Sequence, residues 1–91
     1  MNIPSPITTG YTVYTKSNCG WCRRAKNLLL HATLYNCDDF LKKDRAIFLK
    51  QMGSFIGKEY HTFPMVFFNG EFIGGYEDTK KHIDFNTSLD F

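Results

Sequence analysis

The chain has 91 residues, a hydrophobic fraction of 43%, a charged fraction of 22% and a net charge of +2. This length predicts one domain over residues 1–91, and the small charge gives no general attraction to nucleic acid or membrane surfaces. No apolar run approaches the ~20 residues that cross a membrane, and residues 1–6 lack the basic and apolar regions of a secretory signal, so we expect a cytoplasmic protein.

The first half of the chain predicts a strand and a helix after a loose lead-in. Residues 1–9 contain two prolines and little periodicity, which is typical of a loose segment. Residues 11–14 are β-branched and aromatic and predict a short buried strand, followed by a polar loop over residues 15–18. Residues 20–31 predict a helix, because one face collects apolar side chains, namely Cys22, Ala25, Leu28 and Leu29.

A second strand and a second helix are predicted next. Residues 33–36 form the strand candidate, and Asp38 and Asp39 are candidate caps of a helix that we expect Gly53 to end. Residues 54–61 match no pattern that predicts a helix or a strand.

The last third predicts a hairpin and a final helix. Asn-Gly between the apolar runs 65–68 and 71–73 is the strongest short hairpin signal, and Gly74-Gly75 then breaks the strand before a helix over about residues 76–87. A β-α-β start requires parallel neighbouring strands, whereas the hairpin adds antiparallel ones. The predicted fold is therefore α/β, a four-stranded mixed sheet flanked by about three helices.

Two cysteines, Cys19 and Cys22, stand between the first strand and the first helix. The free N–H groups and the macrodipole at a helix N-terminus stabilise a thiolate, which is the nucleophile of disulfide chemistry. The second cysteine can then attack the mixed disulfide formed by the first. This placement indicates redox chemistry. The third cysteine, Cys37, ends a predicted strand, and we expect it to be a small buried residue.

Cationic residues lie on both sides of this cysteine pair in the sequence. Lys16, three residues before Cys19, would lower the thiol pKa below the ~8.5 of a free cysteine, although a solvated loop lysine is an equal interpretation. Arg23, Arg24 and Lys26 lie in the first helical turns, where the dipole disfavours cations. They are either an ordinary charged helix face or a means of attracting an anionic substrate.

Two further segments have features of a binding site. In Thr62-Phe63-Pro64, a cis bond would leave the Phe63 backbone free to pair with an extended peptide, although the sequence alone favours a trans proline at a strand edge. Gly75 permits close approach of a ligand, and Glu77 and Asp78 begin the last helix either as capping acids or as part of a site that grips a ligand's charged ends.

Three segments, in this order, resemble a dithiol glutaredoxin. They are residues 14–22 (Tyr-Thr-Lys-Ser-Asn-Cys-Gly-Trp-Cys), residues 62–64 (Thr-Phe-Pro) and residues 69–78 (Asn-Gly-Glu-Phe-Ile-Gly-Gly-Tyr-Glu-Asp). Each motif alone is weak, but the three together span most of the chain at the spacing of a thioredoxin-like domain.

The resemblance implies a monomeric, glutathione-dependent thiol–disulfide oxidoreductase. Its partners would be glutathione and disulfide-bearing or glutathionylated proteins, and ribonucleotide reductase is a substrate at the level of the family. Cys19 would be the nucleophile and Cys22 the resolving thiol, while Lys16 would tune the thiolate or meet a carboxylate of glutathione. The other residues implied to bind glutathione are Trp21, Thr62, Phe63, Pro64, Gly75, Tyr76, Glu77 and Asp78.

The sequence departs from the family pattern at several points. Gly20 stands where proline is commonest, and Phe63 replaces a small β-branched residue and so could narrow the groove. Residues 54–61 are a few residues longer than is typical. The basic or amide residue that relatives supply from the second helix therefore has three candidates of equal merit, Arg45, Lys50 and Gln51.

Other functions stay open at this stage. A redoxin reduced by thioredoxin reductase would share the fold but lack the pattern from Gly74 to Asp78. We expect no resident metal. A zinc site from Cys19, Cys22, His31 and Cys37 fits no common spacing, and a [2Fe-2S] cluster that bridges two chains through Cys19 and glutathione is the alternative that Gly20 raises.

Overall fold

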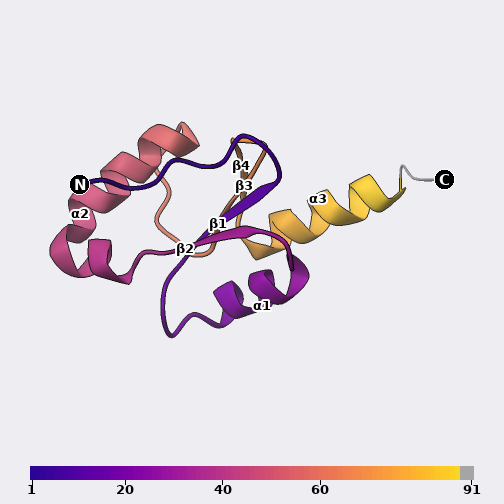
Figure 1. Ribbon diagram of the computed structural model, residues 1–91, viewed down its shortest axis with the longest axis horizontal. Helices are drawn as coiled ribbons and strands as arrows, with labels where there is room; N and C mark the ends of the chain where they lie inside the picture. Colours follow the sequence, from indigo (N-terminus) through magenta and orange to yellow (C-terminus); the bar gives the residue numbers. More distant parts are fainter. Residues whose placement is uncertain (89–91) are drawn as a thin grey trace.

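The computed structural model describes residues 1–88, whose helices and strands follow one another in the predicted order (Figure 1). No helix among these residues combines the length and apolar character needed to cross a membrane. The elements in chain order are β1 (Tyr11–Thr15), α1 (Gly20–Leu28), β2 (Thr33–Asn36), α2 (Asp38–Ile56), β3 (Met65–Phe68), β4 (Glu71–Gly74) and α3 (Tyr76–Ser88).

The four strands form one mixed sheet in the order β2-β1-β3-β4. β1 is parallel to β2 and antiparallel to β3, and β3 pairs with β4 in the predicted hairpin. Asn69 and Gly70 in the turn have φ values of 52° and 85°, the left-handed conformation that a tight hairpin turn requires. The predicted sheet is therefore confirmed, and its central strand β1 leads directly into the cysteine pair.

The helices cover both faces of the sheet. Figure 1 shows α1 and α3 together on one side, away from α2. Strand side chains alternate between the faces, so Val13 and Val66 pack under α1 and α3, whereas their neighbours pack under α2. The fully buried side chains on the α2 side include Tyr14, Phe48, Met52, Met65 and Phe67.

Helix α1 ends three residues earlier than predicted. Leu29 leaves the helical conformation while its N–H still donates to the carbonyl of Ala25 at 2.9 Å, and Leu30 is 79% exposed. Once Leu29 reaches the core, the chain must reverse to enter β2 beside β1, and this reversal ends the helix.

Helix α2 continues past Gly53, which we expected to end it. Gly57, with φ of 90°, is the actual cap, and its N–H donates to the carbonyl of Gly53 at 2.8 Å. Phe55 and Ile56 pack against the core, and this packing outweighs the low helix propensity of a glycine. The first three residues of the unassigned segment 54–61 are therefore helical.

The same helix has a kink where charged residues interrupt its apolar pattern. Asp44 has non-helical backbone angles (φ −163°, ψ 96°), and its carboxylate accepts a hydrogen bond from the N–H of Ile47 at 3.1 Å. Asp44 thus acts as an N-cap for the second part of α2.

Residues 1–9 form no helix or strand, but they contact the body of the molecule. The Tyr14 hydroxyl donates to the carbonyl of Pro4 at 2.6 Å, and the N–H of Ile7 donates to the Thr12 hydroxyl at 3.0 Å. This segment contains no Lys, Arg, Asp or Glu.

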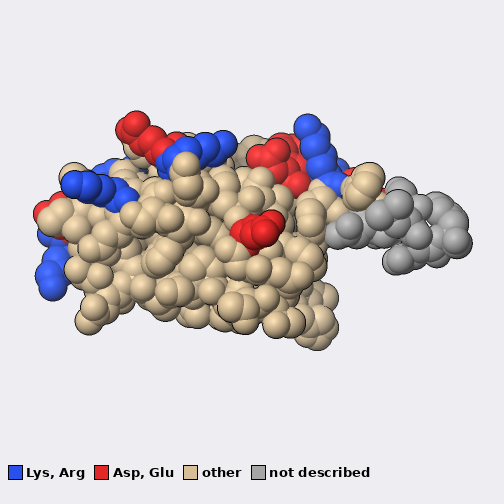
Figure 2. Space-filling model, turned by 90° about the horizontal axis from the view of Figure 1, so that it is seen from above, with Lys and Arg blue, Asp and Glu red and all other residues tan. Residues whose placement is uncertain are grey.

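In Figure 2, charged side chains gather along one edge, over α2 and the first part of α3, while the rest of that face is largely uncharged.

Candidate active site

Cys19 is the N-cap residue of α1. Its backbone is extended, and its Sγ accepts a hydrogen bond from the N–H of Cys22 at 3.1 Å. The two cysteines form a disulfide with their Cα atoms 5.2 Å apart. Cys19 is half-buried, whereas Cys22 is 1% exposed. The two sulfurs therefore share one bond but differ in access, and only Cys19 faces an incoming molecule.

The loop before Cys19 is fixed by a carboxylate from α2. The N–H of Ser17 donates to Asp38 Oδ1 at 2.9 Å, and the Ser17 hydroxyl donates to the other oxygen. These hydrogen bonds hold the pKa of the Asp38 carboxyl below its ordinary value. The capping role expected for Asp38 is thus corrected: Cys37 is the N-cap of α2, without a side-chain cap bond, and Asp38 ties the active-site loop.

We expect this link to make part of the stability depend on pH. A carboxyl whose pKa is lower in the folded state stabilises the protein above its unfolded pKa of ~3.9, and this stabilisation is lost as pH falls. Asp38→Ala should therefore lower the melting temperature at neutral pH, with a gap from wild type that narrows in acid. Thermal unfolding at several pH values measures this gap, with Asp39→Ala as the control; a gap independent of pH would contradict the assignment.

A groove of about 370 Å³ lies beside the cysteine pair. The carbonyl oxygen of Phe63 is 3.9 Å from Cys19 Sγ, and the Phe63–Pro64 peptide bond is cis, not trans as the sequence alone favoured. Eight predicted site residues and one further residue line the groove: Trp21, Tyr60, Thr62, Phe63, Pro64, Gly75, Tyr76, Glu77 and Asp78.

Aromatic rings form one wall of the groove, and cations rest on two of them. Trp21 is 49% exposed, and its ring lies 5.5 Å from that of Tyr76. The Arg24 guanidinium lies 4.7 Å from the centroid of Trp21, and Lys16 Nζ lies 5.7 Å from that of Phe63. Lys16 therefore reaches the site over Phe63.

Two glycines allow the chain to approach the groove closely. Gly74 has φ of 138°, and a Cβ added there would lie 2.8 Å from the Cβ of Asp78. A Cβ at Gly75 would lie 3.3 Å from the hydroxyl of Tyr60. Sequence reasoning missed Tyr60; its position two residues before Thr62 was the available signal.

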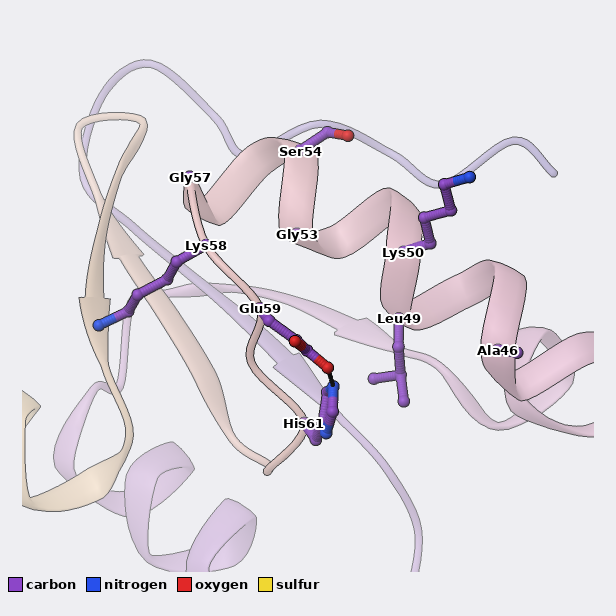
Figure 3. Close-up of a pocket in the computed structure, with 9 residues that line it drawn as sticks. All are labelled: Ala46, Leu49, Lys50, Gly53, Ser54, Gly57, Lys58, Glu59 and His61. Atoms are coloured by element: carbon purple, nitrogen blue, oxygen red, sulfur yellow. Dashed lines mark ion pairs between the residues drawn. The ribbon is translucent and has the colours of Figure 1, made fainter.

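The three candidates from α2 do not line this groove. Lys50 lines a separate hollow of about 660 Å³ between α2 and the loop after it, and Figure 3 shows its side chain directed away from His61 and Leu49, which face each other there. His61 also pairs with Glu59 at 3.0 Å (Figure 3). Gln51 lines another hollow beside residues 1–5. Arg45 lines neither the groove nor either of these two hollows.

Cys37 is fully buried, as expected, and burial raises the pKa of its thiol to about 12. Its Sγ lies 3.6 Å from the carbonyl of Tyr35. Within residues 1–88, no three His, Cys, Asp or Glu side chains are grouped to hold a metal ion, so the zinc set considered above is not assembled.

A cysteine pair at a helix N-terminus, beside a groove formed by a cis-proline loop on a mixed sheet, is the arrangement of a thioredoxin-fold domain with a dithiol site. The comparison with known families is consistent with this class. The glutaredoxin family model matches residues 11–73, and the chain belongs to the glutaredoxin family.

Individual relatives agree. An uncharacterized monothiol glutaredoxin of Caenorhabditis elegans is 34% identical over 79 residues, or 81% of this chain; the chain spans 51% of that relative's length. The dithiolic glutaredoxin 2-C-Grx1 of Trypanosoma brucei brucei is 26% identical (TM-score 0.67), with 90% of this chain and 84% of that chain covered. Buckwheat glutaredoxin in its glutathione complex is 30% identical (TM-score 0.60), with 81% and 68% covered.

Proposed function

We propose that this protein is a glutathione-dependent thiol–disulfide oxidoreductase that reduces protein disulfides and glutathione mixed disulfides. The observation that carries the proposal is the half-buried Cys19 Sγ, which accepts the N–H of Cys22 at the start of α1 and lies 3.9 Å from a backbone carbonyl of the groove. The buckwheat relative, which was solved as a glutathione complex, supports the choice of reductant.

In the reduced protein, Cys19 is the attacking thiolate. It attacks the glutathione sulfur of a mixed disulfide, so that a Cys19–glutathione disulfide forms while the substrate leaves as a thiolate and takes a proton from water. A second glutathione thiolate then attacks the glutathione sulfur on Cys19. Glutathione disulfide is released and the Cys19 thiolate is regenerated.

A protein disulfide follows a different second step. Cys19 attacks one substrate sulfur, and the Cys22 thiolate then attacks Cys19 Sγ and releases the reduced substrate. The product is the Cys19–Cys22 disulfide present in the structure. Two electrons pass from the cysteine pair to the substrate, and two glutathione molecules return them.

The groove residues have the donors and acceptors that a tripeptide needs. The Phe63 backbone would pair with the peptide chain of glutathione, and Trp21 and Tyr76 would form a wall beside it. Asp78, at the first turn of α3, would meet the ammonium of the γ-glutamyl end, and the free N–H groups of that turn would meet its carboxylate. Tyr60 adds a hydroxyl beside Gly75.

A coupled assay tests the proposal. The protein is supplied with glutathione, glutathione reductase, NADPH and a glutathionylated peptide, and NADPH consumption is expected only when all components are present. The same peptide is offered with thioredoxin reductase in place of glutathione and its reductase. Turnover only in the second mixture would favour the thioredoxin-reductase alternative, and turnover in neither would overturn the proposal.

A further inference from the structure

The cations near the cysteine pair form no ion pair among the described residues. Residues 1–37 contain four cationic residues and no Asp or Glu. Among the residues that the structure describes, the ion pair found is Glu59–His61, which involves none of these four. The four residues are Lys16, Arg23, Arg24 and Lys26.

Two of these charges lie over aromatic rings. Arg24 rests on Trp21 and Lys16 rests on Phe63, and both rings line the groove. A ring face orients a cation without using its N–H donors, which stay available to an acid. The side chain of Arg23 is exposed one turn after Cys19. The backbone N–H of Arg23 donates to the carbonyl of Cys19 at 3.2 Å.

We propose that Lys16, Arg23 and Arg24, the cationic rim, select protein substrates with acidic residues next to the reacting cysteine. This inference rests on the proposed function and adds a substrate class to it. Glu77 and Asp78 also line the groove, from the first turn of α3, so the groove has acidic side chains as well as the rings that carry Lys16 and Arg24. Exposed ion pairs are individually weak and are screened by salt, so the rim changes substrate preference by about threefold for each charge at low ionic strength.

The preference is measured with three glutathionylated peptides that differ only beside the cysteine, where they carry Asp, Ser or Lys. Wild type is expected to give the highest kcat/KM for the Asp peptide, and the preference should fade at high ionic strength. Arg24→Gln should lower the Asp-to-Lys ratio by about threefold. Arg24→Lys should largely retain it. Lys58→Gln removes an exposed charge beyond the end of α2 (Figure 3) and should leave the ratio unchanged.

A binding measurement keeps the inference independent of turnover. Trp21 is the only tryptophan, so its fluorescence reports binding beside Arg24 when oxidised protein is titrated with unmodified Asp or Lys peptides. Tighter binding of the Asp peptide that weakens in Arg24→Gln supports the rim. If all peptides bind equally and are turned over equally, the proposed role of the cationic rim is wrong, while the proposed oxidoreductase activity is unaffected. Absence of turnover even for the Ser peptide instead counts against the oxidoreductase.

Discussion

Cys19→Ser is expected to lose all glutathione-dependent activity, down to the rate measured without protein. A serine hydroxyl fits in the space of the thiol, but it stays protonated near neutral pH and cannot attack a disulfide. The structural basis is the hydrogen bond from the Cys22 N–H to Cys19 Sγ at 3.1 Å, together with the macrodipole of α1, both of which favour a thiolate. In reduced wild type, the thiol of Cys19 should therefore titrate below the ~8.5 of a free cysteine.

Two measurements check this prediction. The coupled assay compares wild type with Cys19→Ser, and ultraviolet absorbance of the thiolate follows the titration. Cys37→Ala is the matched control: it also removes a cysteine sulfur, but a fully buried one whose pKa is raised to about 12. If activity survives in Cys19→Ser, or disappears in a folded Cys37→Ala, the assignment of Cys19 as the nucleophile is wrong.

The features that were predictable from the sequence depend on short-range physics. The turn at Asn69-Gly70 requires left-handed backbone, and these two residues adopt it readily, so the hairpin was predicted correctly. Cys19 was placed at a helix start because the change from strand pattern to helix pattern occurs there, and it is the N-cap. The groove residues were instead implied by the resemblance of three segments to dithiol glutaredoxins.

The features that could not be predicted depend on contacts between distant segments. Gly53 looks like a helix end, but Phe55 and Ile56 bury themselves against the core and extend α2. Asp38 looks like a cap, yet its carboxylate binds Ser17, 21 residues earlier in the chain. Tyr60 belongs to no motif and lines the groove because the loop after α2 places it there. In each case, a tertiary contact decided against a reasonable local pattern.

Cys22→Ser is expected to separate the two activities. Only the reduction of a protein disulfide requires a second thiol in the protein, since glutathione itself resolves the Cys19–glutathione disulfide. The hydrogen bond that supports the Cys19 thiolate comes from the backbone N–H of Cys22 and remains when the side chain changes. Removal of glutathione from peptides should therefore continue near the wild-type rate, whereas reduction of protein disulfides should be almost completely lost.

The separation is measured by running both substrates on the same preparation of Cys22→Ser. Because Cys22 is 1% exposed, the new hydroxyl costs about 1–3 kcal/mol if it finds no hydrogen-bond partner, so thermal unfolding must first show a folded protein. When that folded variant is incubated with a protein disulfide in the absence of glutathione, mass spectrometry should detect the substrate trapped on Cys19 as a mixed disulfide, because no thiol is present to release it. Equal loss of both activities, or reduction of protein disulfides without trapped substrate, would remove Cys22 from the resolving role.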